Sequence, residues 1–449
     1  MGDAINPHLE QFARAPRRAL FRLAGPTLLA TIVQTLYNLV DTAYIGRLGA
    51  APLAALTFSF PLFFTLVSFN VGMGVGLNSI LSRRLGAGRR EAAANAVLHG
   101  IAASLFCATV LFLAVEIFLV PLFSLLGATA AVRELACEYM RVIAAGVFLM
   151  FPMYAINSTF AAQGDTLTPM KIQFLALLLN LVLDPLFIFV FGLGIRGAAL
   201  ATNLALAAGC GSALYCLKTR SRLRVRPADW HFSPALVREV FAIGLPASLT
   251  MLLMAFYMMG INRLVAGYGT DTIAALGLVT RLDSAVIIPM VAIAIALLTM
   301  VGTFSGAGRI DLLRAIIRFA LSVNIAFALI CALLFFYCPE LVLGIFTNDP
   351  GPLAKASAYL RLEVLSFPFT AITITINRSL QGLGLSLPGL VINLTRLFLV
   401  SLPLAALFTL VCHYDFRLVA IAALSGNLTA ATLALLWLAR VLKRLPRAD

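Results

Sequence analysis

Apolar stretches long enough to cross a lipid bilayer recur along the whole chain. A membrane-spanning helix needs about 20 consecutive apolar residues. Hydrophobic residues make up 61% of the 449 residues and charged residues only 12%, whereas soluble domains carry about 25% charged residues. The sequence therefore predicts an all-α polytopic membrane protein. We expect twelve transmembrane helices, near residues 19–46, 53–82, 93–120, 134–162, 168–192, 197–217, 236–266, 272–302, 314–337, 353–380, 387–411 and 417–440.

The composition argues against several other classes of protein. The net charge of +14 does not indicate nucleic-acid binding, because the basic residues fall in short loops rather than on a soluble surface. The seven cysteines show no C-x-x-C spacing and fit small packing residues. The four histidines are too scattered for a metal site: they are His8, His99, His231 and His413. We expect no cofactor, with a bound Na⁺ as the one possible exception, and no cleaved signal peptide.

Loop charges predict the orientation of the chain. Basic residues gather before segment 1, after segments 2, 6 and 8, and at the C-terminus: Arg14, Arg17, Arg18, Arg22, Arg83, Arg84, Arg89, Arg90, Lys218, Arg220, Arg222, Arg224, Arg226, Arg309, Arg314, Arg440, Lys443, Arg444 and Arg447. The alternate loops carry far fewer basic residues, such as Arg47, Arg196, Lys355 and Arg417. The positive-inside rule then places both termini in the cytoplasm. We expect a multi-pass membrane protein; its assignment to a bacterial or archaeal inner membrane is what the family resemblance described below implies.

The two halves of the chain resemble each other at a constant offset. Residues 220 positions apart pair Pro26 with Pro246 and Tyr37 with Tyr257, and residues 86–89 with 306–309, both Gly-Ala-Gly-Arg. Later pairs, with slightly shifted register, are Gln163 with Gln381, Pro185 with Pro403 and Asn203 with Asn427. Such repeats are typical of transporters, with the substrate path between the lobes. We predict a cytoplasmic N-terminal segment at 1–18, an N-terminal lobe at 19–217, a linker at 218–235, a C-terminal lobe at 236–440 and a tail at 441–449, in a V shape around a central cavity.

One acid, Asp41, interrupts the first apolar segment. A carboxylate inside a membrane helix costs about 2.5–3.5 kcal/mol on insertion scales, so it normally has a functional role. Gln34 and Asn38 precede Asp41 by seven and three residues and share its helix face. The alternative is a purely structural bond to a neighbouring helix. Asp41 has no acidic counterpart in the second half, where Ile261 occupies the equivalent position.

A second acid, Asp184, lies in segment 5, four residues after Asn180. Segment 6 adds Thr202 and Asn203, and carboxylate, amide and hydroxyl oxygens suit Na⁺ or a transferable proton. If the two carboxyl groups approach closely, repulsion and burial both increase their affinity for a proton. We predict a coupling site at Asp41, Asn180, Asp184 and Thr202, supported by Gln34, Tyr37, Asn38 and Asn203.

Other residues carry weaker expectations. Pro26 breaks a helical hydrogen bond and is a candidate hinge, although its counterpart Pro246 favours a fixed bend. The G-x-G-x-G run at 72–76 indicates close helix packing rather than a nucleotide loop. Glu116 and Glu363 lie near segment ends, where solvation is the simpler interpretation, and Asp283 is not expected to pair with Arg281, two residues away. Candidates for a substrate cavity, where ordinary helix packing is the alternative, are Asn157, Met153, Tyr257 and, with unknown contribution, Gln173.

These motifs resemble those of the multidrug and toxic compound extrusion (MATE) family. The resemblance rests on the two six-helix repeats, the run from Gln34 to Gly49, residues 163–166 and the repeated Gly-Ala-Gly-Arg turns, and it covers residues 15–440. The chain looks like the DinF-type branch, in which positions matching Asp41, Asn180, Asp184 and Thr202 are implicated in cation or proton binding. The NorM-type branch has further acids in segment 10, whose middle, residues 370–377, contains none here.

The resemblance implies a secondary antiporter that exports amphipathic, often cationic, organic compounds in exchange for H⁺ or Na⁺, working as a monomer among membrane lipids. A flippase for lipid-linked saccharides is the alternative within transport. It should hold phosphates in a cationic cavity, whereas most basic residues here lie in loops. A membrane-embedded enzyme would need a catalytic constellation that the sequence lacks, and no P-loop motif is present.

Overall fold

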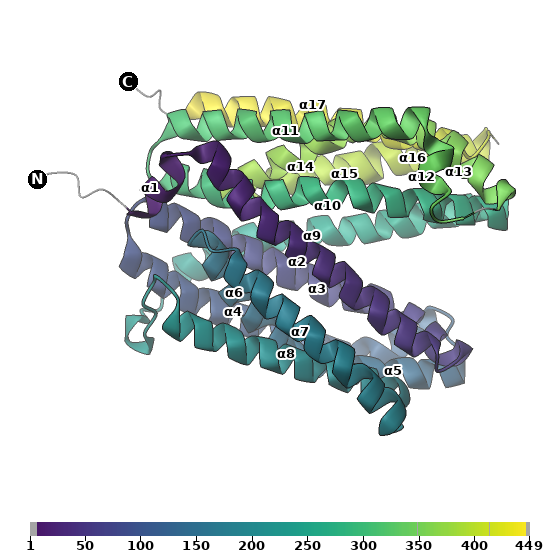
Figure 1. The fold of residues 1–449 in the computed structure, drawn as a ribbon, viewed down its shortest axis with the longest axis horizontal. Coiled ribbons are helices and arrows are strands. Elements are labelled where there is room, and N and C mark those ends of the chain that lie inside the picture. Colours follow the sequence, from purple (N-terminus) through teal and green to yellow (C-terminus); the bar gives the residue numbers. More distant parts are fainter. Residues whose placement is uncertain (1–6, 348, 413, 446–449) are drawn as a thin grey trace, which may run out of the picture. The chain divides into compact units, whose positions relative to one another are not determined.

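The computed structural model describes residues 7–347, 349–412 and 414–445, and within these residues it is almost entirely helical (Figure 1). Eleven helices in the described residues are long and apolar enough to cross a membrane. The count reaches twelve when the bent pair α5 (Ala130–Ala145) and α6 (Val147–Ala162) is one span, broken by 44° at Gly146. The predicted all-α fold with twelve spans is therefore confirmed, although segment 4 is broken rather than straight. Arg447 and His413 lie outside the described residues.

The chain forms two compact units, Gly25–Ser248 and Met1–Ala24 with Leu249–Asp449. We call them the N-terminal unit and the C-terminal unit. The helices of the N-terminal unit are most of α2 (Pro16–Gly46), α3 (Ala50–Gly86), α4 (Arg90–Leu125), α5, α6, α7 (Leu167–Pro185), the π-helix Leu186–Val190, α8 (Gly194–Thr219), the 3-10 turn Pro227–Asp229 and the start of α9 (Pro234–Val265).

The C-terminal unit repeats the pattern. Its elements are α1 (Pro7–Ala13), the start of α2, the rest of α9, the 3-10 turn Ala266–Tyr268, α10 (Thr270–Gly306), α11 (Ile310–Tyr337), α12 (Pro339–Leu343), α13 (Pro350–Glu363), the 3-10 turn Val364–Ser366, α14 (Phe367–Gly382), α15 (Leu387–Leu394), the π-helix Thr395–Ser401, α16 (Leu402–Ala406), the π-helix Leu407–Val411 and α17 (Leu418–Arg444).

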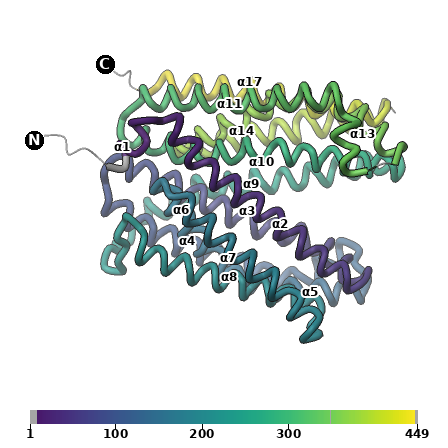
Figure 2. The backbone as a smooth tube through the Cα atoms, viewed as in Figure 1, coloured from purple at the N-terminus to yellow at the C-terminus, as the bar shows by residue number. Residues whose placement is uncertain are grey.

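The boundary between the units falls inside two helices rather than in the linker. It divides α2 between Ala24 and Gly25, and α9 between Ser248 and Leu249. Each of these helices is continuous in the backbone trace (Figure 2). The sequence predicted lobes at 19–217 and 236–440, which follow the repeat. Packing assigns the start of each repeat's first helix to the other unit.

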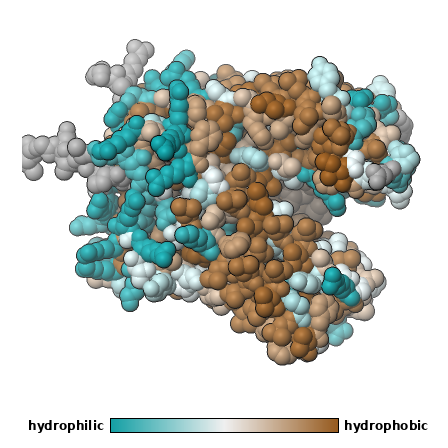
Figure 3. Space-filling view, viewed as in Figure 1, coloured by the Kyte–Doolittle hydropathy of each residue, from teal (hydrophilic) through white to brown (hydrophobic). Residues whose placement is uncertain are grey.

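Each unit buries its own apolar cores and presents apolar side chains outward. Leu77, Ile80 and Phe151 are fully buried in the N-terminal unit, and Leu297, Met300 and Phe304 in the C-terminal unit. Exposed apolar side chains run along the outer faces of the helices, as lipid-facing surfaces require; Ile117 on α4 and Ile330 on α11 are both 65% exposed. In Figure 3 such residues form the brown surface, and hydrophilic residues gather toward the helix ends.

The glycine run on α3 lies where helices pack closely inside the N-terminal unit. A Cβ atom at Gly72 would lie 2.6 Å from the carbonyl oxygen of Gly244 on α9, and one at Gly76 would lie 2.9 Å from that of Val240. Gly74 faces the ring of Tyr154 on α6. The prediction of close helix packing is confirmed, because these backbones leave no room for a side chain.

Candidate functional site

Asp41 points into the N-terminal unit from α2. Its side chain is 8% exposed, and Oδ1 is enclosed without a hydrogen-bond partner among the described residues. Gln34 and Asn38 are exposed, so they do not share this buried environment. Gln34 lies seven residues before Asp41, which is about 10 Å away along the helix axis. The inward pair on this part of α2 is Tyr37 and Asp41, one turn apart.

Asp184 lies at the end of α7 and is fully buried. Asn180, one turn earlier, donates a hydrogen bond from Nδ2 to Asp184 Oδ1 over 2.9 Å. Asp184 Oδ2 and Asn180 Oδ1 are enclosed and lack partners among the described residues. Pro185 follows directly and lacks a backbone N–H, and the next turn is the π-helix Leu186–Val190. Widened turns of this kind are frequent at functional sites.

A hydrogen bond ties α2 to α8 beside these acids. The hydroxyl of Tyr37 donates to Thr202 Oγ1 over 3.0 Å. Tyr37 also interacts electrostatically with Asp41 and Asp184, and the two acids interact with each other. The structure therefore brings together Tyr37, Asp41, Asn180, Asp184 and Thr202 from three helices.

Tyr139 on α5 completes this group and was not predicted. It is 4% exposed and interacts electrostatically with Tyr37, Asp41 and Asp184. A tyrosine in an apolar segment is ordinary in a membrane protein, so the local sequence gave no reason to single it out. The repeat does carry a signal, because Tyr139 and Tyr359 lie 220 positions apart, as Tyr37 and Tyr257 do.

The acid pair has the chemistry of a small-cation or proton site. Neither carboxyl group forms an ion pair within the described part of the chain, and each keeps an enclosed oxygen free of hydrogen bonds. Leaving two carboxylates in such surroundings is unfavourable unless a cation or a proton neutralises them. The free oxygens of Asp41, Asp184 and Asn180 fit Na⁺, which prefers oxygen ligands.

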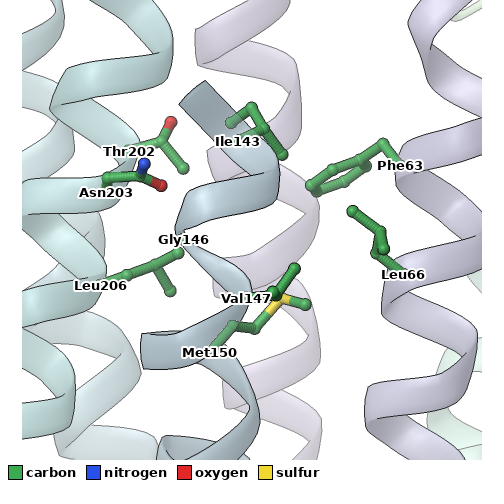
Figure 4. A pocket seen from close by; sticks show the side chains of 9 residues that line it. All are labelled: Phe63, Leu66, Ile143, Gly146, Val147, Met150, Thr202, Asn203 and Leu206. Carbon is green, nitrogen blue, oxygen red and sulfur yellow. The ribbon is translucent and has the colours of Figure 1, made fainter. Parts of the chain in front are cut away.

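A small cavity adjoins Thr202 in the same unit (Figure 4). Its volume is about 10 Å³, room for about one water molecule. Thr202 and Asn203 approach it from α8, and Gly146 from the break between α5 and α6. The remaining lining is apolar: Phe63, Leu66, Ile143, Val147, Met150 and Leu206.

Asn203 belongs to this cavity rather than to the acid pair. Its Nδ2 donates to the carbonyl oxygen of Val142, and its Oδ1 lacks a partner among the described residues. A Cβ atom at Gly146 would overlap Asn203 Oδ1, so the glycine makes room for the amide.

The candidates for a substrate cavity do not form one group. Met153 is buried in an apolar cluster with Ile156 and Phe160, so ordinary packing accounts for it. Asn157 is 7% exposed, with both amide atoms unpartnered in the described residues. Gln173 is half-buried on α7, and Tyr257 belongs to the C-terminal unit.

The C-terminal unit holds a charged cluster, whose two acids the sequence analysis names without predicting that they lie together. Glu363 on α13 accepts a hydrogen bond from Ser366 over 3.5 Å, and it interacts with Tyr359 and with Arg396 on the π-helix Thr395–Ser401. Asp283 on α10 interacts with Glu363. Glu363 is half-buried with Oε2 enclosed, and α13 packs on α10, so this acid is less solvated than expected at a segment end.

The repeat relates this cluster to the cavity of the N-terminal unit. Asp283 and Glu363 lie 220 positions after Phe63 and Ile143, which line that cavity. Each unit thus has a pair of tyrosines at equivalent positions, with acids supplied from different helices. Glu116, in contrast, is partly exposed and pairs with Arg141 over 3.6 Å, as a solvated acid would.

Comparison with known proteins identifies the family. Two successive matches to the MatE family profile cover residues 26–186 and 246–407, and they begin 220 positions apart, as the repeat does. The chain belongs to the MatE family. MatE proteins are membrane transporters rather than enzymes.

Among curated relatives, the chain is 30% identical to an FAD transporter of Shewanella oneidensis, over 87% of each chain. It is 25% identical to a probable multidrug resistance protein NorM of Thermotoga maritima, over 90% of this chain and 87% of that one. The DinF-type branch is not distinguished from the others by these matches and stays a prediction. A flippase for lipid-linked saccharides is not favoured.

Solved MatE structures share the fold. A MOP superfamily transporter from Pyrococcus furiosus matches with a TM-score of 0.91 and 27% identity, over 98% of this chain and 99% of that one. A multidrug resistance transporter of this family in an outward-facing conformation matches with a TM-score of 0.86 and 28% identity, over 96% of both chains.

Proposed function

We propose that this MatE transporter is a secondary antiporter that exports amphipathic, cationic organic compounds in exchange for H⁺ or Na⁺. The observation that carries the proposal is the buried pair Asp41 and Asp184, whose free oxygens lie inside the unit without a basic partner. Relatives named as multidrug export proteins, such as MepA of Staphylococcus aureus at 25% identity, support the substrate class. The predicted setting is a bacterial inner membrane with both termini in the cytoplasm.

Coupling would follow from different affinities in two conformations. A ligand shifts a conformational equilibrium only by the difference in its affinity for the two states. Loading the acid pair would change the charge beside the Tyr37–Thr202 hydrogen bond, which joins α2 to α8. Pro26, inside α2, supplies a position where that helix lacks a hydrogen bond and can bend. Related structures described as straight and bent conformations support such a change.

Transport into proteoliposomes tests this proposal. A fluorescent cationic dye would be followed under an imposed pH gradient and, separately, an imposed Na⁺ gradient. We expect one gradient to drive dye movement in the wild type and the same gradient to fail in Asp41→Asn and in Asp184→Asn. Glu116→Gln is the matched control, because Glu116 is an acid of the same unit that already has a basic partner. Equal coupling in all four proteins would overturn the proposal.

A second candidate cargo is a flavin dinucleotide. The specific observation is the 30% identity to the FAD transporter of Shewanella oneidensis. The same proteoliposomes, loaded with FAD, test this cargo: FAD that leaves the vesicles is measured by its flavin fluorescence. FAD release without dye movement would favour the dinucleotide, and dye movement without FAD release would favour the cationic compounds.

A further inference from the structure

The linker between the two repeats is an ordered strip on the N-terminal unit. Leu223 and Val225 pack into the apolar core of the unit. The alternate residues Arg222, Arg224 and Arg226 are exposed, as is Arg220 at the end of α8. We call the segment from Arg220 to Ser233 the basic strip. Its alternation fixes which side chains face the protein and which face outward.

Buried polar side chains hold the start of this strip in place. Gln163, 4% exposed, accepts hydrogen bonds at Oε1 from the backbone N–H groups of Arg222 (2.8 Å) and Leu223 (3.3 Å). Its Nε2 lies 3.0 Å from Ser221 Oγ. Two backbone groups and a hydroxyl are therefore bound by one fixed amide, so the neighbouring arginines project from a rigid support.

The far end of the strip is anchored to α4. Asn95 exchanges two hydrogen bonds with the backbone of His231, and His99 Nε2 accepts from the N–H of Ser233 over 3.0 Å. The ring of Trp230 stacks on His99 with centroids 4.3 Å apart and 9° between planes. The ring centroid of Phe232 lies 6.1 Å from the ring centroid of His99.

The aromatic end of the strip lies at the edge of the apolar span. His99 is nine residues after the start of α4, about 14 Å along the helix, where the apolar run has already begun. Trp230 is 41% and Phe232 69% exposed. Tryptophan is enriched where the bilayer meets water, because its ring is amphipathic.

The charge of the strip is unbalanced. The four arginines of the strip bring four positive charges, and Lys218 just before it adds a fifth. The one acid of the strip, Asp229, accepts a hydrogen bond from the backbone N–H of Arg226. Among the described residues, no ion pair joins Lys218, Arg220, Arg224 or Arg226 to a carboxylate. Arg83 and Arg84 differ in this respect, because both pair with Glu239 over 3.0 Å.

We propose that the basic strip binds the phosphodiester headgroups of anionic phospholipids. Exposed arginines suit phosphate oxygens, which they contact through two parallel N–H groups. Clusters of basic residues beside a membrane span attract anionic lipids, and the attraction falls off within a Debye length. The exposed rings of Trp230 and Phe232 place the strip at the depth of the lipid headgroups.

Trp230 provides the measurement, because the chain has two tryptophans, Trp230 and Trp437. The full chain with Trp437→Phe would be reconstituted in phosphatidylcholine vesicles containing spin-labelled phosphatidylglycerol or spin-labelled phosphatidylcholine, labelled near the headgroup. We expect the anionic lipid to quench Trp230 fluorescence about threefold more strongly than the neutral lipid, and high salt to remove the difference.

Two charge variants, made in this background, distinguish the strip from general surface charge. Arg220→Gln/Arg224→Gln/Arg226→Gln should quench equally with both lipids, while neutral-lipid quenching stays as in the parent and shows that Trp230 is still in place. Arg440→Gln/Lys443→Gln/Arg444→Gln removes the same charge from the end of α17 and should keep the preference. Equal quenching in the parent protein, or a preference that survives in the strip variant, would overturn the proposal. Loss of the preference on adding millimolar inorganic phosphate, at matched ionic strength, would assign the strip to a free anion instead.

Discussion

At the scale of single residues, the Tyr37 hydroxyl joins α2 to α8 beside the acid pair, so its removal tests the site. Tyr37→Phe removes the donor of the bond to Thr202. We expect a loss of stability of about 1 kcal/mol, as for an ordinary hydrogen bond, with a severalfold slower coupled transport. Thermal unfolding in detergent and the dye assay measure the two effects. Tyr44→Phe is the control, because Tyr44 packs its ring on Phe189 near the same end of α2; an equal effect of both variants would contradict the assigned role.

Arg396 is the basic residue that interacts with Glu363 in the cluster of the C-terminal unit. Arg396→Met leaves Glu363 and Asp283 without a neighbouring cation. We expect destabilisation of about 1–3 kcal/mol, since a charged group left inside the protein without a compensating neighbour is unfavourable. Adding Glu363→Gln to Arg396→Met should restore part of the loss. Unfolding midpoints of the two single variants and the double variant give this cycle, and strictly additive effects would show that the residues do not interact.

At the scale of elements, the crossing of α3 and α9 depends on glycine. Gly72→Ala places a methyl group within 2.6 Å of a backbone carbonyl oxygen. Backbone cannot yield as a side chain can, so we expect a loss of about 1–3 kcal/mol or more. Gly211→Ala on α8 is the matched control, because nothing lies within 4 Å of its Cβ position. Thermal unfolding should separate the two, and equal midpoints would mean that the helices move apart freely.

The helices themselves were predictable from the length of the apolar runs, and Asp41 and Asp184 because acids stand out in such runs. The break at Gly146 was not, because α5 and α6 together are apolar enough for one span. Tyr139 is marked in the sequence by the repeat, and Asp283 and Glu363 stand out as acids, but only packing shows which polar groups lie beside them. Gln34 and Asn38 share a helix face with Asp41, but periodicity does not say where along the helix that face becomes buried.

At the scale of the whole molecule, the predicted orientation has a direct test. Cys338 follows α11 and Cys412 follows the π-helix Leu407–Val411, and both are exposed. With both termini in the cytoplasm, these two cysteines lie on the outer side of the membrane. A membrane-impermeant maleimide added to intact cells should label the wild type and fail to label Cys338→Ser/Cys412→Ser. Labelling only after the cells are opened would reverse the orientation.

The repeat and the two compact units divide the chain at different places, and the predicted lobes, which follow the repeat, stay a prediction. The linker 218–235 is the most polar segment between spans, so the sequence predicts the boundary there. Packing instead divides the chain inside α2 and α9. These two helices run without a break through the division.

The most direct test of the central proposal is the number of coupling ions bound per protein at the acid pair. Proton release, or ²²Na⁺ binding, would be measured on purified wild type, Asp41→Asn, Asp184→Asn and Glu116→Gln as cationic dye is added. The account predicts that dye displaces the bound ion from the wild type and from Glu116→Gln, and that each aspartate variant shows little or no displacement. Displacement of the same amount from both aspartate variants would contradict it.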